Sequence, residues 1–366
     1  MATTGPPKLS AGTKVKEQFT VVKKLGEGAC GAVYLVQNTK NPKIIAAMKI
    51  EAIQKSKDDE ILKMEVFVLK KLQKSRHVCR LLMAGRTPNY SFVVMSLLGK
   101  ELGELRRKMP ERKMSLSTVL RVAVQCVEGI QDMHGIGFIH RDIKPSNFSC
   151  GAARRDVIYL FDFGLARQIV IFDKDGKNPR LREPRIKVSF RGTVRYCSVN
   201  VHLYKEQGRH DDIISMLFML VELLVRALPW KGMARKDSGH IKETVTDAVL
   251  FKGCPPSFTE VFGILKKLTY HDVPPYHKII DIFMKDIKEN KIKMSDPYDW
   301  MKKGFDPPAE GARAKKADEQ AEIEKMEDTN TLRDVDDDSI DTDASEDFTE
   351  TRGFAKEDTL DNVAEM

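Results

Sequence analysis

The chain has 366 residues, 42% of them hydrophobic, so it can bury a large core in two globular units or in one two-lobed unit with extensions. Its six cysteines lie far apart and no pair has metal-ligand spacing, which argues against a disulfide scaffold and a cysteine-bound metal. Because no apolar run reaches the length of a signal peptide or a membrane span, we expect a soluble, intracellular protein, cytoplasmic and with nuclear access left open.

The net charge of +8 conceals an uneven distribution. Residues 301–366 carry nine Lys and Arg against 21 Asp and Glu, a net charge of −12, which leaves +20 on residues 1–300. A basic body suits polyanions, so charge alone leaves nucleic acid open as a partner. No aromatic-interleaved basic strand or recognition helix supports that partner, and no membrane partner is expected.

In chain order, residues 1–18 are rich in Pro, Gly and Lys and are predicted to be a mobile extension. Residues 19–50 contain alternating and β-branched runs broken by a glycine cluster and by Asn-Pro, which predicts three antiparallel strands. A helix with Glu65 set in its apolar face should follow. Two further strands are then predicted near residues 81–84 and 91–95.

The second half is predicted to be largely helical, with helices near residues 116–134 and 212–228. The later helix is apolar nearly all round, but its charged residues favour a buried central helix over a membrane span. After residue 300 large apolar residues become few, so burial cannot offset the entropy of ordering. We therefore predict an acidic, disordered tail over residues 301–366.

A glycine-rich segment with Gly26, Gly28 and Gly31 lies between the first two predicted strands. Glycines there let backbone amides close over phosphate oxygens, although an ordinary glycine-rich hairpin has the same pattern. The third strand ends at Lys49, which by itself resembles any surface lysine. Pairing with Glu65 would satisfy the acid on the apolar face of the helix and hold the lysine in place.

The strongest signal is a pair of motifs, HRDIKPSN at residues 140–147 and DFG at residues 162–164. Phosphoryl transfer needs a carboxylate that orients a hydroxyl and accepts its proton, and Asp142 is placed to do this. It also needs metal ions that neutralise the developing phosphate charge. Asn147 and Asp162 supply oxygens for hard Mg²⁺ ions.

Together these motifs resemble those of protein kinases over about residues 19–300, and Lys144 is the serine/threonine-kinase choice that can steady the transferring phosphoryl group. The resemblance implies an α+β, two-lobed protein kinase fold. Its N-lobe, residues 19–95, would be a small antiparallel β-sheet with one main helix. A hinge at residues 96–99 would join it to a larger, mostly helical C-lobe at residues 100–300.

Below that level the chain resembles the casein kinase I superfamily, and within it the tau-tubulin kinase-like branch. Most protein kinases close the activation segment with Ala-Pro-Glu, whereas residues 192–200 read GTVRYCSVN. The runs LKMEVFVLKKL, HVCRLL, GRHDD, LPW and SDPYDW point the same way.

The resemblance implies a non-specific serine/threonine protein kinase that uses ATP and Mg²⁺. Its implied catalytic residues are Asp142, Lys144, Asn147 and Asp162. Its implied ATP-binding residues are Gly26, Gly28, Gly31, Val33, Ala47, Lys49, Glu65, Met95, Ser96 and Leu98. Among them, Met95 would be the gatekeeper, Ser96 to Leu98 the adenine hinge, and Val33 with Ala47 the roof over adenine. Asp212 would anchor the catalytic loop, and Thr193 would help fix serine/threonine preference.

Two positions depart from the family pattern. The glycine-loop tip, usually a large aromatic residue, is Cys30, which leaves a tolerated substitution, weaker nucleotide binding and a modifiable thiol as alternatives. Ser149 lies where many kinases place an apolar residue beneath adenine, and we expect activity to survive it.

The segment between Gly164 and Tyr196 carries nine basic residues against three acidic ones. An acidic or pre-phosphorylated protein substrate would suit it, and Arg191 with Arg195 is the candidate anion site, with a solvated loop as the alternative. Ser189 is the only Ser or Thr between Gly164 and Gly192, so we expect an active state without phosphorylation of this segment.

Two hypotheses remain beside the main one. The acidic tail could bind the basic body in cis and restrain activity, with solubility or a partner site as alternatives, and cytoskeletal substrates are open. A pseudokinase scaffold that binds phosphorylated partners without phosphoryl transfer is the second function class. A pseudokinase would normally have lost a residue needed for phosphoryl transfer. This chain keeps all five of them: Lys49, Glu65, Asp142, Asn147 and Asp162.

Overall fold

The computed structural model describes residues 7–28, 31–53, 61–173, 178–302 and 305. These residues divide into two compact units. The first comprises the chain up to Lys74 together with Cys79–Gly99, and the second comprises Ser75–Val78 and the chain from Lys100 onward. The predictions for Cys30 and for the acidic tail from residue 306 lie outside the described residues.

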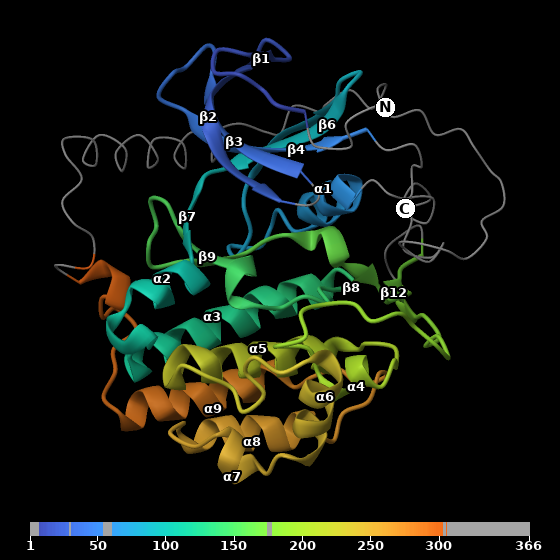
Figure 1. The fold of residues 1–366 in the computed structure, drawn as a ribbon, viewed down its shortest axis with the longest axis vertical. Helices are drawn as coiled ribbons and strands as arrows, with labels where there is room; N and C mark the ends of the chain where they lie inside the picture. The colour runs from blue at the N-terminus through green and yellow to red at the C-terminus, as the bar shows by residue number, and fades with distance from the viewer. Residues whose placement is uncertain (1–6, 29–30, 54–60, 174–177, 303–304, 306–366) are drawn as a thin grey trace. The chain divides into compact units, whose positions relative to one another are not determined.

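The first unit is an antiparallel sheet with one helix, as the sequence patterns predict (Figure 1). The strand order is β1-β2-β3-β4-β6-β5. Strand pairing begins before Phe19, because Lys14–Val15 pairs with Phe19 and Thr20 and buries Val15. Its elements are β1 (Lys14–Val15), β2 (Phe19–Gly28), β3 (Gly31–Asn38), β4 (Ile45–Ala52), α1 (Ile61–Lys71), β5 (Leu81–Arg86) and β6 (Tyr90–Ser96).

The two faces of this sheet differ because side chains alternate along each strand. One face forms an apolar core in which Tyr34, Met48 and Val94 are buried. On each of β3, β4 and β6, the residues that alternate with these core residues therefore point to the opposite face of the sheet. Helix α1 packs on β5 and β6.

The second unit is mainly helical, which confirms the α+β class. Among its described elements, α3 packs against α5 and α9 (Figure 1). Short strands form a sheet ordered β10-β9-β7 and the pairs β11-β8 and β12-β13. The chain enters this unit along β7 (Leu98–Glu101). The other elements are α2 (Leu102–Lys108), η2 (Pro110–Arg112), α3 (Leu116–Gly135), β8 (Phe138–Ile139), η3 (Pro145–Asn147), β9 (Phe148–Gly151), β10 (Ile158–Leu160), η4 (Phe163–Leu165), β11 (Arg167–Gln168), β12 (Val170–Ile171), β13 (Arg180–Leu181), α4 (Val199–His202), α5 (Arg209–Val225), α6 (Arg235–Thr244), α7 (Asp247–Leu250), α8 (Pro256–Leu265), α9 (Tyr276–Glu289) and η5 (Asp299–Met301).

A side-chain cap explains where α3 begins, and apolar residues explain why α5 is buried. Ser115 accepts a hydrogen bond from the amide of Thr118 at 3.2 Å and so caps α3. Helix α5 is buried continuously from Arg209 to Leu223, as its apolar sequence predicts. None of the helices in the described ranges combines the length and apolar character needed to cross a membrane.

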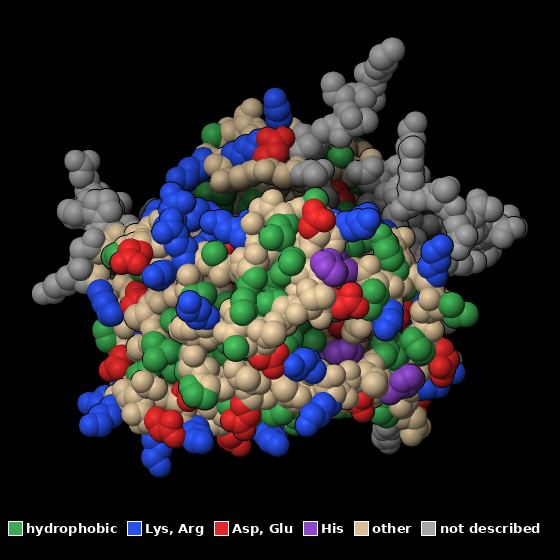
Figure 2. All heavy atoms as spheres, turned by 60° about the horizontal axis from the view of Figure 1, so that its bottom comes forward, with side chains coloured by type: hydrophobic (Ala, Val, Ile, Leu, Met, Phe, Trp, Pro, Cys, Tyr) green, Lys and Arg blue, Asp and Glu red, His purple; other side chains and the backbone are tan. Residues whose placement is uncertain are grey.

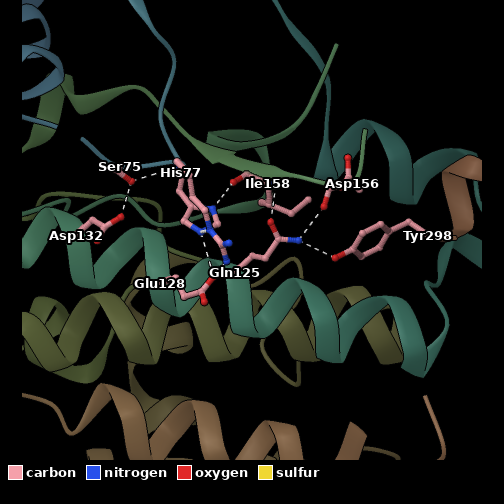
Figure 3. A network of polar contacts seen from close by, with 9 residues as sticks. Ser75, His77, Gln125, Glu128, Asp132, Asp156, Ile158 and Tyr298 are labelled. Atoms are coloured by element: carbon pink, nitrogen blue, oxygen red, sulfur yellow. Dashed lines mark hydrogen bonds and ion pairs between the residues drawn. The ribbon is translucent and has the colours of Figure 1, made fainter. Parts of the chain in front are cut away.

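A polar network explains why Ser75–Val78 belongs to the second unit (Figure 3). The buried ring of His77 bonds through Nδ1 to the carbonyl of Ile158 at 2.8 Å and through Nε2 to Glu128 at 3.1 Å. Gln125 of α3 accepts from the amide of Ile158 and donates to Tyr298, at 2.9 and 2.7 Å. The network fixes β10, the strand that leads directly into the DFG motif.

Candidate functional site

In the first unit, four predicted nucleotide-binding residues share one face of the sheet. Val33 pairs with Lys49 across β3 and β4, and Ala47 pairs with Met95 across β4 and β6. Residues directly opposite one another in neighbouring strands point to the same side. This side is the one opposite the apolar core, so the four side chains line a common surface.

Lys49 and Glu65 form the predicted ion pair, Nζ to Oε2. The Glu65 side chain is only 6% exposed, whereas that of Lys49 is 20% exposed. The pair therefore keeps the acid inside and leaves part of the lysine accessible. The same negative charge acts on Cys79, because burial and then the charge of Glu65 raise the pKa of its thiol to about 12.

The glycine-rich hairpin brings Gly28 opposite Gly31, and the two residues between them are outside the described ranges. A Cβ on Gly31 would lie 2.0 Å from the backbone oxygen of Ile50, so the approach of β3 to β4 requires glycine there. A Cβ on Gly26 or Gly28 would meet nothing within 4 Å. Internal packing does not demand glycine at those two positions, which fits a surface that a ligand approaches closely.

The remaining predicted hinge residues lie at the end of this unit. Met95 and Ser96 end β6, and Leu98 begins β7. Ser96 is held at both groups, since its amide donates to the carbonyl of Arg80 at 2.9 Å and its hydroxyl accepts from the amide of Arg80 at 3.0 Å. The backbone is thus fixed where an adenine would need hydrogen-bonding partners.

In the second unit, Asp142 is the centre of a buried polar group. Lys144 Nζ reaches Oδ2 at 2.5 Å, and the hydroxyl of Thr193 donates to Oδ1 at 2.6 Å. Asn147 donates its side-chain amide to the carbonyl of Asp142 at 2.9 Å. Both oxygens of the Asp142 carboxylate therefore accept a hydrogen bond from within the chain.

Asp212 of α5 holds the backbone of the same loop. Its Oδ2 accepts from the amide of His140 at 2.7 Å and its Oδ1 from the amide of Arg141 at 2.9 Å. Burial works to raise the pKa of Asp212, but the hydrogen bonds that the carboxylate accepts from the His134 ring and from the amide of His140 outweigh it, and the net shift is downward. The anchor is therefore an ionised carboxylate at neutral pH.

His134 and Tyr276 complete this anchor. Burial lowers the pKa of His134, so the ring is neutral, and Nε2 lies 2.9 Å from Asp212. Nδ1 lies 2.7 Å from the hydroxyl of Tyr276. Both contacts are satisfied when Nε2 carries the proton and Nδ1 accepts from the tyrosine.

Two non-glycine residues of the motifs have left-handed backbones. Arg141 has φ 67° and Asp162 has φ 66°, an uncommon region for such residues that often marks functional positions. Gly192 has φ 110°, and a Cβ there would lie 2.5 Å from the carbonyl of Arg141. Only glycine lets residues 192–193 approach the loop this closely.

Asn147 and Asp162 fit the chemistry of a hard metal ion. Because the nitrogen of the Asn147 side chain donates to Asp142, its Oδ1 is the atom left for a metal. Both residues offer the oxygen ligands that such ions prefer. Among the described residues no cluster of three or more His, Cys, Asp and Glu side chains forms a metal site.

The candidate anion site, Arg191 with Arg195, contains an arginine that is already paired with an acid of the same unit. Arg195 forms an ion pair with the buried Glu222 of α5 at 3.2 Å, although its side chain is 41% exposed. Tyr196 donates to the other oxygen of Glu222 at 2.5 Å. Arg191 accepts a bond at its backbone carbonyl from Gln207. Ser149, the other unusual position, is buried in β9.

Comparison with known proteins agrees with this geometry. A profile of the protein kinase domain matches residues 19–262. A "Probable serine/threonine-protein kinase" of Dictyostelium discoideum is 40% identical over 80% of this chain and 58% of its own length. A "Putative serine/threonine-protein kinase" of Caenorhabditis elegans is 37% identical over 81% of this chain and 85% of its own. A "Putative casein kinase I" of the same worm is 30% identical over 80% and 86%.

The chain belongs to the protein kinase family, with its two-lobed α+β fold. It is a serine/threonine protein kinase, the class named for its relatives at 37–40% identity. The family uses ATP and a divalent metal ion and acts on protein substrates. The chain spans 58% of the length of the Dictyostelium relative.

Proposed function

We propose that this chain transfers the γ-phosphoryl group of ATP to serine or threonine hydroxyls, with Asp142 as the residue that orients the hydroxyl and accepts its proton. The observation that carries this proposal is the Asp142 carboxylate, bonded to Lys144 and to the hydroxyl of Thr193, on a loop whose amides are fixed by Asp212. Lys144 would neutralise charge that develops on the transferring group.

The nucleotide role of the first unit is supported by the common face of its sheet. There Lys49, steadied by Glu65, would contact phosphate oxygens, the three glycines would admit them, and Val33 and Ala47 would cover the adenine. Met95, Ser96 and Leu98 would line its edge. Asn147 and Asp162 would hold Mg²⁺, which supplies positive charge to the phosphate oxygens.

Further proposals concern domain limits, subfamily and substrates. The kinase domain would span residues 19–300, with the hinge at residues 96–99, an extension before it and the acidic tail after it. A place in the casein kinase I superfamily is supported by residues 192–200 and by the casein kinase I name of one relative. The tau-tubulin kinase-like branch within it is proposed on the resemblance of the sequence motifs. Acidic or pre-phosphorylated substrates, cytoskeletal ones among them, and a cytoplasmic location complete the proposal.

The distribution of charged side chains limits which basic residues could produce the proposed preference for acidic substrates. Figure 2 shows acidic side chains lying among the basic ones on one face of the second unit. Arg195 is partly neutralised by Glu222. A preference for acidic substrates would then come from the other exposed basic residues between Gly164 and Tyr196. The acidic tail would compete with the substrate for these residues.

The experiment is phosphate transfer from γ-labelled ATP to casein, with Mg²⁺ or Mn²⁺, by the wild type, by Asp142→Asn and by the matched control Asp281→Asn. Asp281 is an exposed residue of α9. We expect label on serine or threonine, and a loss of about 100-fold or more in Asp142→Asn alone, the scale of losing a general base. ATP binding without transfer by the wild type would instead establish the scaffold, and equal activity of both variants would remove Asp142 from its role.

Two additions test the finer proposals. Peptides that differ only in Asp, phosphoserine or Ala beside the target hydroxyl test the preference for acidic segments. A chain that ends at residue 304 tests restraint by the tail, because removing a competitor should raise activity and weaken its dependence on salt. Equal rates for all three peptides, or for both chain lengths, would contradict the corresponding proposal.

A further inference from the structure

A buried carboxylate, Glu206, joins two separated parts of the activation segment, which is taken here as residues 164–200. Glu206 lies between α4 and α5, and its side chain is 3% exposed. Arg185 approaches it with Nε at 2.7 Å and Nη2 at 3.2 Å, one to each oxygen. The amide of Arg185 also donates to it at 3.3 Å.

Arg167 approaches the same carboxylate from the beginning of the segment. Its Nε lies 3.4 Å from Oε1, and its side chain is 1% exposed. Arg167 is in β11, directly after the DFG motif, whereas Arg185 follows β13. The Glu206 carboxylate therefore connects β11, the strand after the DFG motif, to Arg185, which lies seven residues before Gly192.

The two arginines favour the ionised form of the Glu206 carboxylate. Burial works to raise the pKa of Glu206, but the hydrogen bond from Arg185 and the charges of Arg167 and Arg185 outweigh it and lower the pKa. The carboxylate is ionised at neutral pH. The forked contact of Arg185 is the geometry that arginine also uses for phosphate.

The segment is fixed on the side of Arg185 that leads back to β12. Leu181 pairs with Val170, and the amide of Arg182 donates to the carbonyl of Ile169 at 2.8 Å. The hydroxyl of Tyr270 donates to the carbonyl of Arg182 at 2.9 Å. From Arg185 the chain runs eight residues to Thr193, whose hydroxyl bonds to Asp142.

Activation segments that are switched become ordered when a phosphoryl group pairs with arginines. Here two arginines already have an anion, and the only Ser or Thr between Gly164 and Gly192 is the exposed Ser189. We propose that Glu206 is a positioning residue that acts as a permanent internal substitute for such a phosphoryl group. By holding Arg185, it fixes the position of residues 185–193 and so places the Thr193 hydroxyl against Asp142. The proposal rests on the proposed function and identifies its regulation: Arg167 and Arg185 are occupied from within and are not part of the substrate anion site.

The test is removal of the carboxylate and its return in solution. Glu206→Ala should lower kcat/KM for a peptide substrate roughly tenfold, the scale of a typical coupling between a switching element and a site. The KM for ATP should stay unchanged. Sodium acetate should restore activity to this variant, because acetate carries the missing carboxylate, whereas acetamide and sodium chloride at equal concentration should not.

Three controls define the result. Asp286→Ala removes another buried carboxylate, on α9, and should give no activity that depends on acetate. Glu206→Ala combined with Arg185→Ala should not be rescued, because the fork that binds the anion is gone. Glu206→Gln keeps the shape without the charge and serves if the alanine variant fails to fold; we expect it to lose activity as well.

A second readout does not depend on catalysis. Hydrogen exchange of residues 178–193 should be faster in Glu206→Ala and should slow again with acetate. Wild-type exchange in the variant, full activity of Glu206→Gln, equal rescue by acetamide, or acetate that restores thermal stability without activity would each overturn the proposal. A wild type that transfers no phosphate would contradict the proposed function, and the exchange experiment would still decide whether Glu206 orders the segment.

Discussion

The two units hold their predicted functional residues by different means. In the first unit, Val33, Lys49 and Met95 share a face because neighbouring strands are in register. In the second unit, the loop with Asp142 depends on Asp212, which lies 72 residues after His140. A substitution in the sheet therefore removes one side chain from a preformed surface, whereas one at the loop anchor moves several groups together.

The largest effect should follow from Asp212→Ala, which tests the second half of this comparison. It would leave two buried amides and His134 without their acceptor, at a cost of about 1–3 kcal/mol for each of these groups in the free energy of unfolding. Displacement of Asp142 should lower kcat about 100-fold. Thermal unfolding and peptide phosphorylation measure the two effects.

Asp212→Asn serves as the graded control, because it keeps one acceptor oxygen and should lie between the wild type and the alanine variant in both measurements. A normal kcat in a destabilised Asp212→Ala would show that the loop keeps its geometry without this anchor. The two units would then not differ in the way proposed.

Sequence patterns predicted the first unit almost completely, since alternation and glycine breaks are local signals. They identified β2 to β6, α1 and the partner of Lys49, and missed only the early pairing of Lys14–Val15. The resemblance to protein kinases also located Asp142 and Asp212.

The contacts that hold the second unit together were not predictable in this way. The pairing of Glu206 with Arg167 and Arg185 joins residues up to 39 positions apart, and that of Arg195 with Glu222 joins a loop to an apolar helix. No periodicity marks such pairs. A charged residue within an apolar or buried stretch, as with Glu65, is the one signal that could have drawn attention to Glu222.

An intermediate effect should follow from Glu65→Gln, which tests the first half of the comparison. Lys49 would lose its charged partner while the sheet stays in register, so the KM for ATP should rise roughly tenfold, or about 1.4 kcal/mol. Thermal stability should change little. Glu51→Gln is the matched control, because Glu51 is also buried and contacts α1 through the amide of Leu62 at 2.8 Å. Equal effects of the two variants would attribute the change to α1 rather than to Lys49.

The smallest effect should come from Lys242 of α6, and it concerns stability above neutral pH. Its buried Nζ donates to the carbonyls of Val194 and Cys197 at 2.6 and 2.7 Å. Burial lowers its pKa to about 8, below the 10.5 of a free lysine. Between these values the unfolded chain binds the proton and the folded chain does not, so stability rises with pH.

Relative to Lys242→Met, which cannot titrate, the melting temperature of the wild type should increase by about 2–4 °C between pH 8 and pH 9. Below pH 8 the difference between the two proteins should be constant, since lysine is then protonated in both states. Thermal scans at half-unit steps measure this. A difference that stays flat up to pH 9 would mean that the carbonyls of Val194 and Cys197 keep Lys242 charged in the folded protein despite its burial.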